Sequence, residues 1–329
     1  MTPRSLRELP KPHLHLHIDG SYPRAWVASL AERLGSDFVP PDGFPDTDEF
    51  FRRYMEVPAL ISSLDELSAG CRMLVESEAA NGTVYMEPGV EPQLHSPRLG
   101  SLEDVFSAMW AGFRDGAQAT GVEVGCMVGV NTDFPVTVAE EVAAVAARRA
   151  GDGVVAFGTA GFVEPAGLGR FRGVVERARA AGLRIVCHAG QTGGPESVSE
   201  ALDELRPDRI AHGVQAARDG GVLRRLAGAG VVCDVALTSN VRLGVVPGIE
   251  DHPLPTMLEA GVRVTLNADD ELWFGSGIDH EYELARDVFG LDDERLAGIA
   301  LSSLDATGAS DDCRNRWRSG VASWLQRSD

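Results

Sequence analysis

The stretch Lys11-Pro-His-Leu-His-Leu-His-Ile-Asp-Gly20 alternates histidine with apolar residues near the start of the chain. If it forms a β-strand, successive side chains point to opposite faces, so that His13, His15 and His17 share one face and the apolar residues share the other. Three imidazoles on one buried face need partners that an apolar core does not supply. The pattern therefore predicts a metal-binding strand, and a packed strand with hydrogen-bonded histidines is the alternative.

Length, composition and charge narrow the class of protein. The chain has 329 residues, of which 44% are hydrophobic, enough for one large α/β domain or two ordinary ones. Its net charge of -19 argues against a nucleic-acid partner, which calls for a basic surface. The five cysteines are odd in number and include no Cys-x-x-Cys pair, as expected of reduced thiols. No secretory leader or bilayer-spanning apolar run is evident, so we expect a soluble cytoplasmic protein without a membrane partner.

Short apolar or β-branched runs alternate with longer segments of helical periodicity along the chain. The helical segments include 102–120, 136–150, 168–181, 198–205 and 255–260, and several stretches before a strand end in glycine, a common helix terminator. Eight strand and helix alternations predict an α/β fold of the (β/α)8 TIM barrel type, with a doubly wound sheet as the alternative. The predicted strands are 14–18, 83–86, 122–130, 154–157, 184–188, 209–212, 231–237 and 262–267.

Residues suited to binding lie at or just after the carboxyl ends of these predicted strands. In a barrel the carboxyl ends meet at one mouth, whereas an open sheet would spread them apart. The segment of about 38–79 is too long for a simple connection, and we interpret it as a helical insertion over the mouth after the first strand. Residues 1–329 are predicted to form one domain. The residues at the strand ends are His17, Glu87, Gly161, His188, His212, Asn240, Asp269 and Asp270.

Three further motifs add candidate metal ligands to the first strand. His188 closes the run 184–188, His212 closes 209–212, and Asp269 with Asp270 follows 262–267. Alone, each histidine could be a hydrogen-bonded core residue, and the two carboxylates could cap the next helix. Together, three imidazoles and a carboxylate would hold a divalent metal with room for water; zinc suits this nitrogen-rich set, with iron, manganese or cobalt as alternatives. Such a metal lowers the pKa of its water to near neutrality, which predicts metal-assisted hydrolysis.

The order of these motifs resembles the adenosine deaminase family of the amidohydrolase superfamily. The resemblance implies a (β/α)8 barrel with one zinc, whose bound hydroxide attacks C6 of an adenine ring and releases ammonia. The implied substrate is a purine nucleoside or a related small amino-heterocycle. The motifs that carry the resemblance are Leu9-Pro-Lys, His15-Leu-His17-Ile-Asp-Gly, His188-Ala-Gly, His212-Gly, Thr238-Ser-Asn240 and Asn267-Ala-Asp-Asp270.

The resemblance also implies roles for single residues. His212 matches the histidine that orients or deprotonates the water, and Asp270 matches the carboxylate that hydrogen-bonds N7 of the purine. Gly161 matches the glycine whose backbone N–H approaches the ring. Asp19 lies beside His17, which also faces the substrate, and matches a position where nucleoside-specific members carry Asp toward the ribose and adenine-specific members tend to carry Glu. Asp19 therefore favours a nucleoside, with a simple turn residue before Gly20 as the alternative. The implied metal ligands are His15, His17, His188 and Asp269.

Gln191 departs from the family at a residue that carries chemistry. The family has a glutamate there, which donates a proton to N1 of the purine. A carboxamide can donate a hydrogen bond but cannot transfer a proton. General acid catalysis contributes about 10² to 10⁴ in rate, so deamination of adenosine should be slowed at least that much unless another group substitutes. Gln191, His212 and Asp269 form the predicted catalytic set.

Two other departures accompany Gln191. Tyr85-Met-Glu87-Pro-Gly89 lacks the family's arginine, and Gly158-Thr-Ala-Gly161 lacks its aspartate. We hypothesise that the two were partners, because losing both members of an ion pair leaves no buried orphan charge. Three explanations compete: a changed substrate or reaction, a catalytically silent nucleoside-binding relative, or an introduced inactivating substitution. The departures at Gly89 and Gly158 favour the first.

Overall fold

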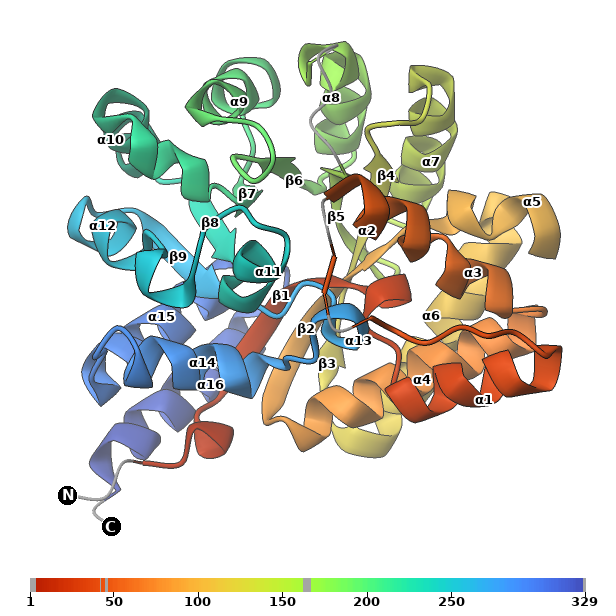
Figure 1. Ribbon diagram of the computed structural model, residues 1–329, viewed down its shortest axis with the longest axis horizontal. Helices are drawn as coiled ribbons and strands as arrows, with labels where there is room; N and C mark the ends of the chain where they lie inside the picture. Colours follow the sequence, from red (N-terminus) through yellow and green to blue (C-terminus); the bar gives the residue numbers. More distant parts are fainter. Residues whose placement is uncertain (1–3, 42, 45–46, 162–166, 328–329) are drawn as a thin grey trace.

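Eight parallel strands follow one another around a nearly closed barrel in the computed structural model, which describes residues 4–41, 43–44, 47–161 and 167–327 (Figure 1). Between the last strand and the first, the Asp269 N–H donates to the His15 carbonyl at 3.1 Å and the His17 N–H to the Asp269 carbonyl at 2.9 Å. The (β/α)8 barrel is confirmed and the doubly wound alternative is excluded. The order is β1 (Lys11–His17), β2 (Thr83–Val90), β4 (Cys126–Asn131), β5 (Val154–Ala160), β6 (Arg184–Ala189), β7 (Arg209–His212), β8 (Val232–Val235) and β9 (Arg263–Leu266), and the short β3 (Glu123–Val124) pairs with β2.

Helices surround the barrel (Figure 1). Local sequence sets their ends: the Ser101 side chain and Asp104 form a capping box at the start of α6, and Gly121, with φ of 80°, ends it. The predicted bounds of this helix, 102–120, are confirmed. The helices are α1 (Arg24–Leu34), α2 (Thr47–Tyr54), α3 (Glu56–Leu60), α4 (Leu64–Ala80), α5 (Ser96–Leu99), α6 (Leu102–Thr120), α7 (Val136–Arg148), α8 (Arg172–Ala180), α9 (Pro195–Glu200), α10 (Gly220–Ala229), α11 (Leu237–Arg242), α12 (Leu254–Glu259), α13 (Glu271–Phe274), α14 (Ile278–Asp287), α15 (Asp293–Ala306) and α16 (Asp311–Gln326).

The segment 38–79 contains α2, α3 and most of α4. Phe50, Phe51 and Tyr54 of α2 line the pocket at the mouth of the barrel. By contrast, α4 packs against α6 as one of the helices outside the barrel. Residues 42 and 45–46 of the segment lie outside the described residues.

Glu87 does not lie at the mouth, so that prediction is wrong. The sequence Pro88-Gly89 resembles a turn signal, but β2 continues through it to Val90 in parallel register with β1. Glu87 is consequently inside the barrel, where its Oε2 lies 2.7 Å from Nη1 of Arg209. The same guanidinium places its Nε 3.0 Å from Oδ2 of Asp234. One buried cation therefore holds two buried carboxylates on β2 and β8.

Removing this cation is expected to destabilise the barrel strongly. Substitution Arg209→Met leaves both carboxylates without their countercharge, and breaking a buried pair costs about 3–5 kcal/mol in the free energy of unfolding. Urea denaturation followed by circular dichroism measures the change. Arg225→Met is the matched control, because Arg225 pairs with Asp203 on the surface and such pairs contribute about 1 kcal/mol or less. Equal effects of the two substitutions would contradict the prediction.

The five cysteines are free thiols, as expected from their spacing. Cys71, Cys126, Cys187 and Cys233 are buried and Cys313 is partly exposed. Within the described part of the chain, no helix combines the length and the apolar character needed to cross a membrane.

Candidate metal centre and substrate pocket

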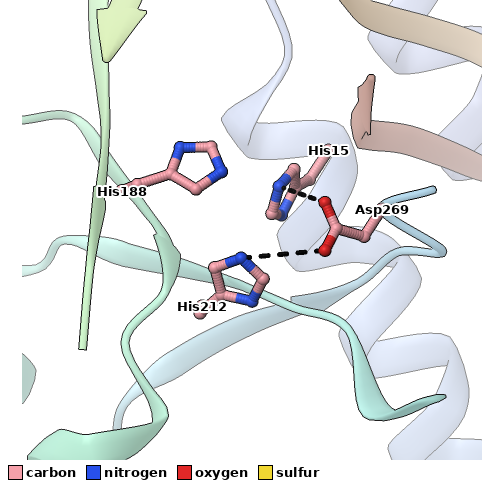
Figure 2. Close-up of side chains that lie close together, drawn as sticks. All are labelled: His15, His188, His212 and Asp269. Atoms are coloured by element: carbon pink, nitrogen blue, oxygen red, sulfur yellow. Dashed lines mark ion pairs between the residues drawn. The ribbon is translucent and has the colours of Figure 1, made fainter. Parts of the chain in front are cut away.

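Side chains from distant parts of the sequence converge at the mouth of the barrel. His15 and His17 come from β1, His188 from β6, and Asp269 follows β9. Nε2 of His17 lies 3.3 Å from Nε2 of His15 and 3.2 Å from Nε2 of His188. Oδ1 of Asp269 lies 3.0 Å from Nε2 of His15 and 3.4 Å from Nε2 of His17. Figure 2 shows His15, His188 and His212 grouped with the Asp269 carboxylate.

These separations suit a small cation. Ligand atoms about 2.0–2.1 Å from a tetrahedral zinc lie about 3.3 Å from one another, and the four distances run from 3.0 to 3.4 Å. A related group that has His212 in place of His17 also keeps its ligand atoms within 4.8 Å of one another. The structure thus brings the four predicted ligands, His15, His17, His188 and Asp269, into one place.

The second nitrogen of two rings fixes their protonation. Nδ1 of His188 lies 2.7 Å from the Thr159 carbonyl oxygen, and Nδ1 of His15 lies 3.3 Å from the Asp234 carbonyl oxygen. A carbonyl can only accept, so each Nδ1 carries the hydrogen and each Nε2 directs a lone pair at the centre. Burial lowers the pKa of His188 well below its usual value and the pKa of His17 to about 4, so both rings are neutral. This donor set fits a divalent metal.

His15 and Asp269 shift each other's pKa values in opposite directions. Burial lowers the pKa of His15, but the Asp269 carboxylate 3.0 Å away outweighs burial and the net change is a rise. The neighbouring histidines correspondingly hold the pKa of Asp269 well below its usual value despite burial. A bound metal would compete with protons for the same lone pairs.

Asp269 and His212 adopt left-handed backbone conformations that are uncommon outside glycine. Their φ angles are 66° and 68°, and residues held in this way cluster at functional sites. The Ser239 hydroxyl donates to Oδ2 of Asp269 at 2.6 Å. Nε2 of His212 lies 3.8 Å from the same oxygen and has no hydrogen-bond partner among the described residues. His212 therefore presents an unused polar atom beside the predicted ligands.

The pocket over this centre collects most of the predicted substrate contacts. Three aromatic side chains of α2 form part of its wall, and Gln191 lies on it without a hydrogen bond to any other described residue. His15 and Asp19 do not line it. The lining residues are His17, Phe50, Phe51, Tyr54, Glu91, Asn131, Ala160, Gly161, His188, Gln191, His212, Leu243, Asp269 and Asp270.

Asp270 has a buried oxygen left over for a ligand. Its Oδ1 has no hydrogen-bond partner among the described residues. Burial, with the nearby charges of Asp269, Glu91 and Asp19, raises its pKa well above the usual value. A Cβ on Gly20 would lie 1.7 Å from this oxygen, so only glycine at position 20 leaves room for the carboxyl group.

The Asp19 carboxylate pairs with His95, which was not predicted from the sequence as a site residue. Both its oxygens lie near Nε2 of His95, at 3.0 and 3.2 Å, and both side chains are buried. The two residues are 76 positions apart in the sequence. The predicted contact between Asp19 and a ribose stays a prediction, and in this structure the carboxylate is directed at His95.

Glu91 and Asn131 are pocket residues that sequence reasoning missed. Glu91 follows β2 and Asn131 ends β4, so both lie at the carboxyl ends of strands, where the residues of a barrel site gather. Glu91 was not predicted as a site residue because the strand was predicted to end before Pro88, well short of Glu91. Gln93 donates from Nε2 to Oε1 of Glu91 and to the Gly129 carbonyl, each at 3.2 Å. Glu91 is thereby fixed on the wall.

The two glycines that mark the departures from the family lie beside one side chain. Met127 of β4 has its Cε 3.3 Å from the position of a Cβ on Gly89 and its Sδ 3.1 Å from that of a Cβ on Gly158. The positions are therefore neighbours inside the barrel, which the hypothesis of a lost pair requires. Here Met127 fills the space between them.

His13 does not join the other two histidines of β1. The pairing of β1 with β2 shifts register between His13 and Leu16, and Nδ1 of His13 lies 2.8 Å from Oε2 of Glu78 on α4. The Ala268 N–H donates to its Nε2 at 2.9 Å. For His13 the alternative of a hydrogen-bonded core histidine is the correct one.

Known proteins of one family resemble this chain over nearly its whole length. Residues 10–324 match the family described as adenosine deaminase. An adenine deaminase from a Chelativorans species is 35% identical over 303 residues, which cover 90% of this chain and 93% of that protein. An adenine deaminase from Agrobacterium fabrum is 33% identical over 313 residues, covering 93% and 96% respectively. The crystal structure of an adenine deaminase from Arthrobacter aurescens matches with a TM-score of 0.89 at 28% identity, covering 97% of this chain and 99% of that one.

Proposed function

Because the chain belongs to the adenosine deaminase family of metal-dependent hydrolytic deaminases, we propose that it removes the amino group of an aminopurine supplied as the free base. The observation that carries this proposal is Glu91, a buried carboxyl group on the pocket wall. Asp19, on which a preference for nucleosides would rest, is paired with His95 and does not line the pocket. The named relatives that act on adenine are consistent with this choice.

Strand order supports a position for Glu91 at the far edge of a bound ring. In a ring of eight strands, β2 lies opposite β7, so Glu91 faces His212 across the mouth. A purine whose amino-bearing carbon points to His212 and the metal ligands presents its N3 and N9 side to β2 and β4. In a nucleoside the sugar replaces the hydrogen on N9, and a carboxyl group held at this edge would meet carbon instead of N–H.

The protonation of Glu91 matches the edge of a free base. Burial, with the charges of Asp19 and Asp133, raises the pKa of Glu91 to about 8. Below that pH the neutral carboxylic acid can donate to N3 and accept from N9–H at the same time. Above that pH the O–H donor is lost, so the fit to the free base weakens as pH rises through about 8.

The metal is assigned to His15, His17, His188 and Asp269, and we propose zinc because three imidazoles and one carboxylate suit it. When bound, zinc supplies Lewis-acid activation of a water molecule at neutral pH. The residues around it would position the base. The Asp270 carboxyl group, whose pKa is raised by burial, would hydrogen-bond to N7, and the Gln191 carboxamide would donate a hydrogen bond to N1. The free cysteines support a reducing compartment, and we propose a cytoplasmic location.

Ammonia release from the zinc-loaded protein tests the substrate. We expect a higher kcat/KM for adenine than for adenosine. Glu91→Leu removes both hydrogen bonds to the ring edge and should lower kcat/KM for adenine about 10- to 100-fold. Glu91→Gln keeps one donor and one acceptor, so it should retain activity and lose the decline above pH 8.

Three outcomes would contradict this proposal. Faster turnover of adenosine than of adenine would mean that the substrate is a nucleoside, and would support the predicted contact of Asp19 with the ribose. Equal activity of Glu91→Leu and Glu91→Gln would mean that Glu91 makes no hydrogen bond to the substrate. Tight binding of purines without any ammonia release would favour the catalytically silent relative.

A further inference from the structure

A chain of hydrogen bonds runs from the backbone of α12 to the pocket. The Leu254 N–H donates to Nδ1 of His252 at 3.1 Å. Nε2 of His252 lies 3.0 Å from Oδ1 of Asn240, and Nδ2 of Asn240 lies 3.2 Å from Nδ1 of His212. The side chains of His252, Asn240 and His212 are buried, so water does not compete for these contacts.

The direction of every bond follows from the first one. A backbone N–H can only donate, so Nδ1 of His252 has a lone pair and its hydrogen is on Nε2. That hydrogen is donated to Oδ1 of Asn240, which turns the amide nitrogen towards His212. Since the amide nitrogen also only donates, Nδ1 of His212 carries no hydrogen. His212 is therefore neutral, with its hydrogen on Nε2.

We propose that His252 and Asn240 are positioning residues that hold His212 in this tautomer, so that its Nε2–H can only donate a hydrogen bond into the pocket. This Nε2 has no hydrogen-bond partner among the described residues. Of the two roles implied for His212, orienting the attacking water and deprotonating it, the arrangement selects the first. The inference rests on the proposed function for its effect on rate, but the tautomer itself can be observed without turnover.

Nitrogen NMR of the zinc-loaded protein, labelled at its eight histidines, reads the tautomer directly. In the parent protein we expect one set of His212 signals, with Nε2 protonated and Nδ1 bare; His212→Gln identifies them. Asn240→Asp has the same shape but offers only acceptor oxygens to Nδ1, and should move the hydrogen of His212 to Nδ1. His252→Leu should release the amide and give mixed tautomers, and His252→Gln, which can still donate to Asn240, should restore the parent signals.

Kinetics provide the second measurement. His252→Leu should lower kcat for adenine about 10- to 100-fold with KM nearly unchanged, because misplacing a catalytic group affects the chemical step. Met257→Ala is the packing control: Met257 is buried on the adjacent helix α12 and is outside the hydrogen-bond chain. It should alter neither the His212 signals nor kcat.

Two results would overturn the inference. One is a parent His212 protonated on Nδ1; the other is a His252→Leu protein whose His212 signals are those of the parent. If no heterocycle is deaminated, the proposed function fails, and the NMR comparison still decides whether His252 and Asn240 set the tautomer. If adenine is deaminated and the tautomer does not respond, only the inference fails.

Discussion

Gln191→Glu is expected to raise kcat/KM for adenine about 10²- to 10⁴-fold, the range that a positioned general acid contributes. Gln191 lies on the pocket wall and makes no hydrogen bond to any other described residue, so a glutamate of the same shape should fit without breaking a contact. The carboxamide can only hold N1 by a hydrogen bond. A carboxylic acid can also transfer the proton that the ring needs as water adds to the amino-bearing carbon. The loss of adenine absorbance under steady-state conditions measures the change.

Gln191→Leu is the matched control for this gain. It has a similar volume and neither donor nor acceptor, so it should fall below the parent protein by the value of one hydrogen bond, about 10-fold. A large gain with glutamate and a small loss with leucine would mean that Gln191 alone limits the reaction. If glutamate gave no gain, the ring would receive its proton elsewhere, or the substrate would be a heterocycle that needs none.

The fold could be predicted because two simple periodicities run through the chain. Runs such as 209–212 and 102–120 keep one period from end to end, and both have the predicted bounds in the structure. The convergence of His17, His188 and Asp269 could be predicted because each lies at or near the carboxyl end of such a run. Parallel strands of a barrel bring their carboxyl ends together whatever the intervening sequence.

The rest of the site depends on contacts that no local pattern reports. Glu91 was not predicted because Pro88-Gly89 resembles the end of a strand. In the structure these two residues continue the pairing of β2 with β1. His252 lies in a connection before α12 and reaches the pocket only through Asn240. Such contacts are formed by packing between elements that are far apart in the sequence, so no regular residue spacing identifies them.

Substitution of a predicted metal ligand is expected to cause the largest loss of activity, together with loss of the bound metal. Asp269→Ala removes the only carboxylate of the ligand set and its negative charge, so bound zinc should fall from about one equivalent to near zero. Loss of the metal costs several kcal/mol of transition-state stabilisation, so kcat should fall about 10³-fold or more. His188→Ala, on β6, tests the same site through a second ligand. Emission spectrometry after dialysis and the ammonia assay give the two readouts.

The second group of possible ligands, formed by His13, Glu78 and Glu271, supplies the control. Nε2 of His13 accepts from the Ala268 N–H, so Nδ1 carries a hydrogen and donates it to Glu78. A metal there would first have to displace that hydrogen and its hydrogen bond, whereas His188 and His15 offer lone pairs without that cost. Glu78→Gln should therefore leave zinc at one equivalent. Two equivalents in the parent, or loss of zinc in Glu78→Gln but not in Asp269→Ala, would place the metal behind the first strand instead of at the mouth.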